Sequence, residues 1–184
     1  MDPLWADLIN SDWRDHLGSG RREDRIGKDT WLSRFLARAG WSGDRLPEEA
    51  DRTRLRRLRG TLRSLVDAIR ENRPVAEADL IVLNEALATA RLVRRLEHRD
   101  GVWRVRLDPG AAGIARVEAE VAASFASMLA EGDPTRIKVC ANPDCGWVMY
   151  DESRSRTRQW CDATECGNLI KVRRFRQRQR ARSG

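Results

Sequence analysis

Residues 140–166 read CANPDCGWVMYDESRSRTRQWCDATEC and contain all four cysteines of the 184-residue chain. Cys140 and Cys145 form one C-x4-C pair, and Cys161 and Cys166 form a second pair after fifteen intervening residues. Two close pairs on either side of a loop allow four thiolates to meet at one tetrahedral ion, which is the closed geometry of structural zinc. The stretch therefore predicts a small four-cysteine zinc finger whose folding depends on one structural Zn²⁺ ion.

Other roles for the four cysteines fit the sequence less well. Disulfides need an oxidising compartment, and the N-terminus lacks the basic start and apolar block of a secretory signal. A redox dithiol is typically a C-x-x-C motif beside a βαβ unit, and the sequence shows neither. Four thiolate ligands leave no open position for water, so a catalytic zinc ion is not expected.

The residues around the cysteines predict how the finger is built. Residues 147–150 are expected to form a short hairpin, and the C-terminal segment a helix with Leu169, Val172 and Phe175 facing inward. A glycine follows the second cysteine of each pair, where it permits the positive φ of a sharp knuckle turn. Knuckle, hairpin, knuckle and helix is the order of a treble-clef zinc finger. We therefore expect a small treble-clef-like module with four cysteine ligands over residues 136–184.

The first 135 residues predict a mainly α-helical domain with one β-hairpin, which is an α+β fold. Its longest helix begins at Pro47 and ends at Asn72-Arg73-Pro74, and its apolar residues keep to one face of a 3.6-residue repeat. These residues are Leu55, Leu58, Leu62, Leu65, Val66 and Ile69. Residues 92–98 and 102–107 are rich in β-branched and aromatic side chains and flank an Asp-Gly turn, so they predict the hairpin. Other helices are expected over residues 2–9, 29–39, 80–90 and 114–129, and a loop over residues 18–27.

Charge is distributed unevenly between these two parts. The chain has 35 Lys and Arg against 28 Asp and Glu; residues 1–135 hold 23 of each sign, and residues 136–184 hold 12 basic and 5 acidic side chains. Such concentration is typical of a surface that binds a polyanion, with DNA as the first candidate, although a solvated tail is the alternative. The candidate nucleic-acid contacts are Arg154, Arg156 and Arg158 in the finger loop, Lys171, Arg174 and Arg178 on one flank of the C-terminal helix, and Arg173, Arg176 and Arg180 on the other.

Several of these stretches resemble a known family. Residues 140–154, 158–161 and 166–168 resemble the CGNR zinc finger of bacterial proteins. Its usual partner is an N-terminal ABATE domain, and residues 8–11 and 83–84 are similar to short pieces of that domain. The resemblance implies a stress-induced transcription regulator whose finger binds DNA and whose larger domain senses a ligand.

This chain departs from the family motif at one position, and its sequence does not identify the effector. Leu169 stands where the family has arginine, so the motif reads C-G-N-L. Five of the seven tryptophans precede residue 135, and Asn10, Asp29 and Arg104 are the polar residues expected to line an effector pocket with them. The alternative is that the tryptophans fill the core.

The sequence also limits the remaining function classes. It has no nucleotide-binding, zinc-protease or serine-hydrolase motif, so we expect no enzymatic activity. No run of 18 apolar residues occurs, so we expect no membrane partner and a cytoplasmic location. Trp147, Tyr150 and Trp160 lie among arginines, which leaves RNA or a protein open as the partner. A homodimer would suit a palindromic DNA site, although no heptad seam is present.

Overall fold

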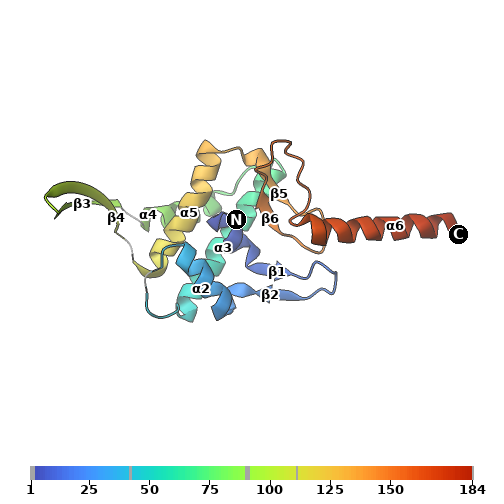
Figure 1. Cartoon of the computed structure of the whole chain (residues 1–184), viewed down its shortest axis with the longest axis horizontal. Coiled ribbons are helices and arrows are strands. Elements are labelled where there is room, and N and C mark those ends of the chain that lie inside the picture. The colour runs from blue at the N-terminus through green and yellow to red at the C-terminus, as the bar shows by residue number, and fades with distance from the viewer. Residues whose placement is uncertain (1–2, 42, 90–91, 111, 184) are drawn as a thin grey trace.

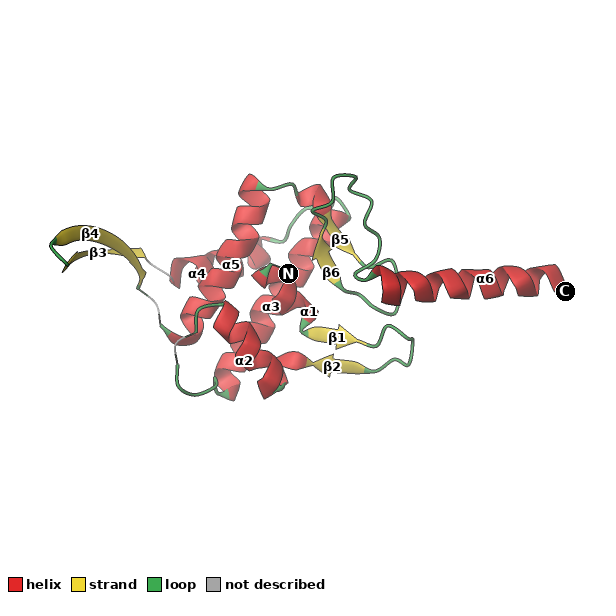
Figure 2. Cartoon of the chain, viewed as in Figure 1, coloured by secondary structure: helices red, strands yellow, loops and turns green. Residues whose placement is uncertain are grey.

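The computed structural model of the chain describes residues 3–41, 43–89, 92–110 and 112–183. The predicted N-cap Asp2 and the predicted helix end Ala90 lie outside these residues. Within them, the helices form a bundle to which three two-stranded antiparallel sheets are attached (Figure 2). In chain order the elements are α1 (Leu4–Asn10), β1 (Asp12–Arg14), β2 (Arg22–Asp24), α2 (Asp29–Arg38), α3 (Glu49–Arg70), α4 (Glu77–Thr89), β3 (Leu92–Arg99), β4 (Val102–Pro109), α5 (Gly113–Glu131), β5 (Ile137–Val139), β6 (Val148–Tyr150) and α6 (Asn168–Ser183).

The core lies between α1, α2, α3 and α5, and α4 packs on α3 and α5. The apolar stripe of α3 is buried as predicted, apart from the partly buried Ile69. Trp5 is fully buried and meets the ring of Phe125 edge-on, with ring centroids 5.4 Å apart. Trp103, in contrast, is 65% exposed on β4. The mainly α-helical fold with small hairpins is thus confirmed, and none of the described helices is both long and apolar enough to span a membrane.

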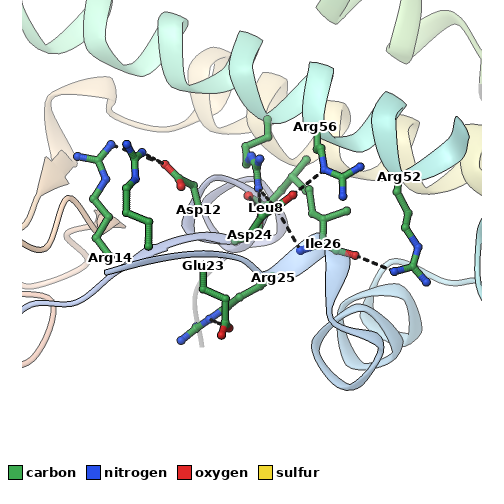
Figure 3. Close-up of polar contacts among 12 residues, drawn as sticks. Leu8, Asp12, Arg14, Glu23, Asp24, Arg25, Ile26, Arg52 and Arg56 are labelled. Atoms are coloured by element: carbon green, nitrogen blue, oxygen red, sulfur yellow. Dashed lines mark hydrogen bonds and ion pairs between the residues drawn. The ribbon is translucent and has the colours of Figure 1, made fainter. Parts of the chain in front are cut away.

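A row of arginines runs along α3 beside its apolar stripe, at Arg52, Arg56, Arg59 and Arg63. Asp24 of β2 accepts hydrogen bonds from Arg56 Nε and Arg59 Nη1, each at 2.6 Å, and Figure 3 shows it between β2 and α3. Burial alone would raise the pKa of Asp24, but the hydrogen bonds and charges of these two arginines outweigh it and hold the pKa below its ordinary value. An ionic network therefore ties the β1–β2 hairpin to the longest helix.

The β1–β2 hairpin corrects the loop expected over residues 18–27. β1 pairs antiparallel with β2, and Asp12 lies opposite Asp24. Each strand has only three residues, most of them charged, so no alternation of apolar and polar residues marks it in the sequence. Side chains help to hold the strands together, as where Arg22 Nη2 donates to Asp12 Oδ2 at 2.7 Å.

The finger's hairpin also differs from the prediction. β6 does not form a hairpin with its neighbours in residues 147–150; it pairs antiparallel with β5, and Val139 lies opposite Val148. Four residues are too few for two strands and a turn, and the partner strand precedes the first cysteine. Ile137 and Val148 belong to the same buried cluster as the helices. The finger and the helical domain therefore share one core across the boundary at residue 135.

α6 and the β3–β4 hairpin project from opposite ends of the molecule (Figure 1). Ile170 is buried at the start of α6, but Val172 is 39% exposed and Phe175 is 56% exposed. The prediction that Leu169, Val172 and Phe175 face inward is therefore wrong for the last two residues. Periodicity identifies one face of a helix, but it does not show whether the body of the protein lies against that face.

Candidate metal centre and nucleic-acid interface

The four cysteines meet between the β5–β6 hairpin and the start of α6. Cys140 and Cys145 come from the loop between β5 and β6, whereas Cys161 and Cys166 come from the segment just before α6. All four Sγ atoms lie within 4.8 Å of one another, and the Cys145–Cys161 and Cys161–Cys166 pairs are each 3.6 Å apart. Sulfur ligands about 2.3 Å from a tetrahedral ion are about 3.8 Å from each other. The four side chains therefore fit a closed metal site.

Backbone hydrogen bonds build the first knuckle. The Cys140 N–H donates to the Trp147 carbonyl oxygen at 2.8 Å, and the Cys145 N–H donates to the Asn142 carbonyl oxygen at 3.0 Å. Gly146 has φ of +67°, as the sequence predicts for the residue after the second cysteine. The glycine allows the chain to turn tightly enough for both cysteines to face one point.

The second glycine has a role that the sequence analysis did not predict. Gly167 lies in the helical turn Ala163–Gly167 and does not have positive φ. A Cβ atom at Gly167 would lie 3.1 Å from Cδ1 of Trp160, so the close approach of the indole ring favours glycine. Trp160 and Trp147 pack against the cysteine cluster. This packing occupies two of the aromatic side chains that were candidates for stacking on bases.

The crowded sulfurs control one another's protonation. The hydrogen bond with Cys161 lowers the pKa of Cys145 to about 5, and burial raises the pKa of Cys166 to about 11. The pKa of Cys161 is raised because its thiol is committed to the hydrogen bond with Cys145. Neighbouring thiols can thus stabilise one thiolate, whereas several thiolates at this separation repel one another. A divalent cation would remove that repulsion and hold all four side chains as thiolates.

Asn142 is a fully buried side chain beside the sulfurs that the sequence analysis did not single out. Its Nδ2 donates to the His16 carbonyl oxygen at 2.8 Å and lies 3.5 Å from Cys166 Sγ. Its Oδ1 accepts from the Asp144 N–H at 3.2 Å. The amide therefore orients one ligand and joins the knuckle to the β1–β2 loop. The Asn-Pro pair two residues after Cys140 signals a turn, but not this contact.

Asn10, one of the predicted pocket residues, is committed to β6. Its Nδ2 donates to the Val148 carbonyl oxygen and its Oδ1 accepts from the Val148 N–H, each at 2.8 Å. Arg63 of α3 donates to the Gly146 carbonyl oxygen at 3.1 Å, and burial lowers the pKa of Arg63. The helical domain thus holds both the knuckle and the strand that follows it.

Arg173 belongs to the predicted nucleic-acid contacts, and in the structure it joins α6 to the body. Its Nη1 donates to Asp144 Oδ2 and its Nη2 donates to the Leu17 carbonyl oxygen, each at 2.7 Å. Gly18 has φ of +90°, and a Cβ atom there would lie 3.0 Å from both the Asp144 and the Arg173 side chains. The tip of the β1–β2 hairpin therefore fits closely against the second turn of α6 and fixes the direction of the helix.

The other basic candidates on α6 face solvent. These candidates are Lys171, Arg174, Arg176, Arg178 and Arg180. Their side chains are exposed and form no hydrogen bond or ion pair with the described residues. α6 has 16 residues and is therefore about 24 Å long. The helix presents a strip of positive charge over most of that length.

The three finger-loop arginines differ in how they are held. Arg156 has φ of +55° and pairs with Asp133 Oδ2 at 2.9 Å. Arg158 donates to the carbonyl oxygens of Trp160 at 3.1 Å and Cys161 at 2.6 Å. Arg154 is exposed and makes no such contact with the described part of the chain. Of these three loop arginines, Arg154 is the one that is exposed and has a guanidinium group uncommitted within the described residues.

The structure does not bring the three predicted pocket residues together. Asn10 ends α1 and is buried against Val148. Asp29 begins α2, where its 70% exposed side chain accepts a hydrogen bond from Arg52 at 2.8 Å. Arg104 lies on the exposed β4 strand. These residues do not line a common cavity.

Two known protein families match the chain, one over its helical domain and one over its cysteine-bearing finger. The family described as "Putative stress-induced transcription regulator", ABATE, matches residues 2–132, and the CGNR zinc finger matches residues 136–179. No curated protein matches the chain. The two matches adjoin just before β5, where the structure continues from the helical domain into the cysteine-bearing hairpin. The chain therefore belongs to the ABATE family and carries a CGNR zinc finger after its ABATE domain.

Proposed function

We propose that this chain is a zinc-containing transcription regulator that binds duplex DNA through α6. The observation that carries the proposal is the row of exposed basic side chains, the five candidates and Arg182, on a helix that stands clear of the body. Arginines four residues apart, such as Arg174 and Arg178, repel each other on a helix. DNA phosphates would relieve that repulsion and release counterions. The proposed role is binding alone, and no catalytic step is assigned to the chain.

The shape of α6 suits a duplex. The major groove of B-DNA is about 12 Å wide and admits an α-helix. Among the described residues, Ile170 and Arg173 anchor the start of α6 to the body, and the exposed basic side chains beyond them are available to a groove. Arg154 of the finger loop would add a backbone contact beside it. Leu169 replaces the family arginine and is partly buried, so phosphate contacts rather than that position would supply the affinity.

Zinc is the ion that we propose for the cysteine centre. Four thiolates in a closed tetrahedral arrangement favour Zn²⁺ over the harder divalent cations, which prefer oxygen ligands. Because the second cysteine pair lies just before α6, the ion would fix the orientation of the DNA-binding helix relative to the hairpin β5–β6.

Binding of the zinc-loaded protein to a fluorescently labelled DNA duplex tests the proposal. We expect the double variant Arg174→Gln/Arg178→Gln to bind at least about tenfold more weakly at low salt, because two DNA phosphates then have no cationic partner. The matched control is Arg34→Gln/Arg70→Gln, which removes two exposed arginines from α2 and α3 and should leave the affinity unchanged. Equal affinities for wild type and the α6 variant would overturn the proposal.

A competition experiment separates DNA from the alternative partners. We expect an unlabelled DNA duplex to displace the labelled duplex at lower concentration than an RNA duplex or a single-stranded RNA does. The packing of Trp147 and Trp160 on the cysteine cluster supports this order, because stacking on unpaired bases needs free aromatic faces. Preferential displacement by RNA would make RNA the partner instead.

A further inference from the structure

Two apolar surfaces of the chain are uncovered, and the first lies on the β3–β4 hairpin. Its register pairs Leu96 with Val105 and His98 with Trp103, so these four side chains share one face. Leu96, Val105 and Trp103 are 62%, 64% and 65% exposed. The rings of His98 and Trp103 stack with centroids 4.4 Å apart, which stiffens the tip. We call this surface the ribbon face.

The alternation of side chains indicates that the ribbon face is normally covered. The residues that alternate with those of the ribbon face point to the opposite side; they include Arg95, Glu97, Arg104 and Arg106. On that side Arg106 Nη1 lies 3.7 Å from Glu97 Oε1. One apolar and one charged face is the pattern of a sheet that packs on one side only. The hairpin extends away from the body, and a two-stranded hairpin alone is marginally stable in water.

The second uncovered surface is the outer side of α4. Leu80 is 39% exposed and Ile81 is 51% exposed there, although the helix buries Leu83 and Ala86 against its neighbours. Within Glu77–Thr89 the helix has three acidic residues, Glu77, Asp79 and Glu85, and no basic one. Asp79 accepts a hydrogen bond from Ser64 of α3 at 2.6 Å and Glu85 pairs with Arg57 of α3 at 3.7 Å, so the outer side is apolar and Glu77 is its acidic residue without a partner among the described residues.

We propose that the ribbon face of one copy packs on the outer side of α4 in a second copy, and that two such contacts close a twofold dimer. The two surfaces also carry opposite charges where they would meet, because Arg94 lies on the ribbon face and Glu77 of α4 has no partner among the described residues. Arg94 lies on the same side of the ribbon as Leu96, where it would meet Glu77 of the second copy. The hairpin points away from its own α4, so the two surfaces can meet only between copies (Figure 1).

The exposed apolar area of the two surfaces is close to the minimum that a dimer interface needs. Leu96, Trp103 and Val105 of the ribbon and Leu80 and Ile81 of α4 would each lose on the order of 100 Å² of exposed area, so the two symmetric contacts together would bury roughly 1,000 Å². That apolar total is at the lower limit for a biological interface, and polar contacts such as that of Arg94 would add to it. The proposed dimer does not depend on DNA binding, so an experiment can overturn either proposal without affecting the other.

The mass of the full-length, zinc-loaded protein in solution, measured by light scattering after size exclusion, tests the dimer. We expect a dimer at micromolar concentration, and a dissociation constant at least about 30-fold weaker in Leu96→Glu and in Ile81→Glu. Val102→Glu is the matched control, because Val102 is 48% exposed on the opposite face of the ribbon. That variant should remain dimeric. A monomeric wild type, or equal weakening by Val102→Glu, would overturn the proposal.

Mixing the variants identifies which surfaces meet. The Leu96→Glu chain keeps an intact α4, and the Ile81→Glu chain keeps an intact ribbon face. An equimolar mixture should therefore restore one of the two contacts and form a heterodimer that neither variant forms alone. If Ile81→Glu stays dimeric while Leu96→Glu does not, the ribbons pair with each other and the assignment of α4 is wrong. Circular dichroism checks that both variants stay folded.

Discussion

The side chain of Asn10 shows how one residue joins the two parts of the chain. Both ends of its amide bond the backbone of Val148 in a buried position. We expect Asn10→Ala to lower the free energy of unfolding by about 2–3 kcal/mol, because it leaves a buried N–H and carbonyl unpaired. Urea unfolding of the zinc-loaded protein measures the change, and Gln177→Ala on the exposed side of α6 is the control. A change no larger than that of the control would contradict the role assigned to Asn10.

Asp24 makes stability depend on pH. Its pKa in the folded chain lies below its ordinary value of 3.8, so the stability that it adds is present above that pH and is lost as the pH falls through the folded value. We expect Asp24→Asn to lower the free energy of unfolding by about 1 kcal/mol at pH 6. The expected change is small because the carboxylate is about a third exposed, so water screens its interaction with the arginines. The difference from wild type should shrink below about pH 4. A difference that stays constant between pH 6 and pH 3 would show that the charge of Asp24 is not the cause.

At the scale of elements, Arg173 and Arg174 are neighbours on α6 with different roles. Arg173 bonds Asp144 and Leu17, whereas Arg174 faces solvent. We expect Arg173→Gln to speed hydrogen exchange of the backbone amides in the first turns of α6, because the helix is then no longer bonded to the β1–β2 hairpin by this side chain. Arg174→Gln removes the same charge and should leave that exchange unchanged. Mass spectrometry of exchanged peptides compares the two variants. Equal exchange rates in both would show that Arg173 does not anchor α6.

The elements also show what the sequence can and cannot predict. The α3 helix and the cysteine centre are predictable because each has a strong local pattern, a 3.6-residue apolar repeat and two C-x4-C pairs. The β1–β2 hairpin is missed because its three-residue strands are charged and are held by arginines from α3. The pairing of β6 with β5 is missed because it depends on residues on the far side of a cysteine pair. Long-range contacts of this kind leave no local signal in one sequence.

At the scale of the whole molecule, the finger and the helical domain form one packed body. Ile137 and Val148 lie in the main core, and Asn10, Arg63 and Asn142 bond across the boundary. We therefore expect removal of the metal by a chelator to lower the unfolding temperature of the entire chain by roughly 10 °C or more, in a single transition. Differential scanning calorimetry measures this. Two transitions, the higher one unaffected by the chelator, would show that the helical domain folds independently of the finger.

The salt dependence of the affinity shows most directly whether α6 binds DNA through its exposed basic side chains. The logarithm of the binding constant of the zinc-loaded protein for a DNA duplex is plotted against the logarithm of the salt concentration. We expect Arg174→Gln/Arg178→Gln to make the slope shallower by about 1.8, or about 0.9 for each phosphate that is no longer neutralised, and Arg34→Gln/Arg70→Gln to leave the slope unchanged. Equal slopes for wild type and the α6 variant, or no binding at low salt, would contradict DNA binding by α6.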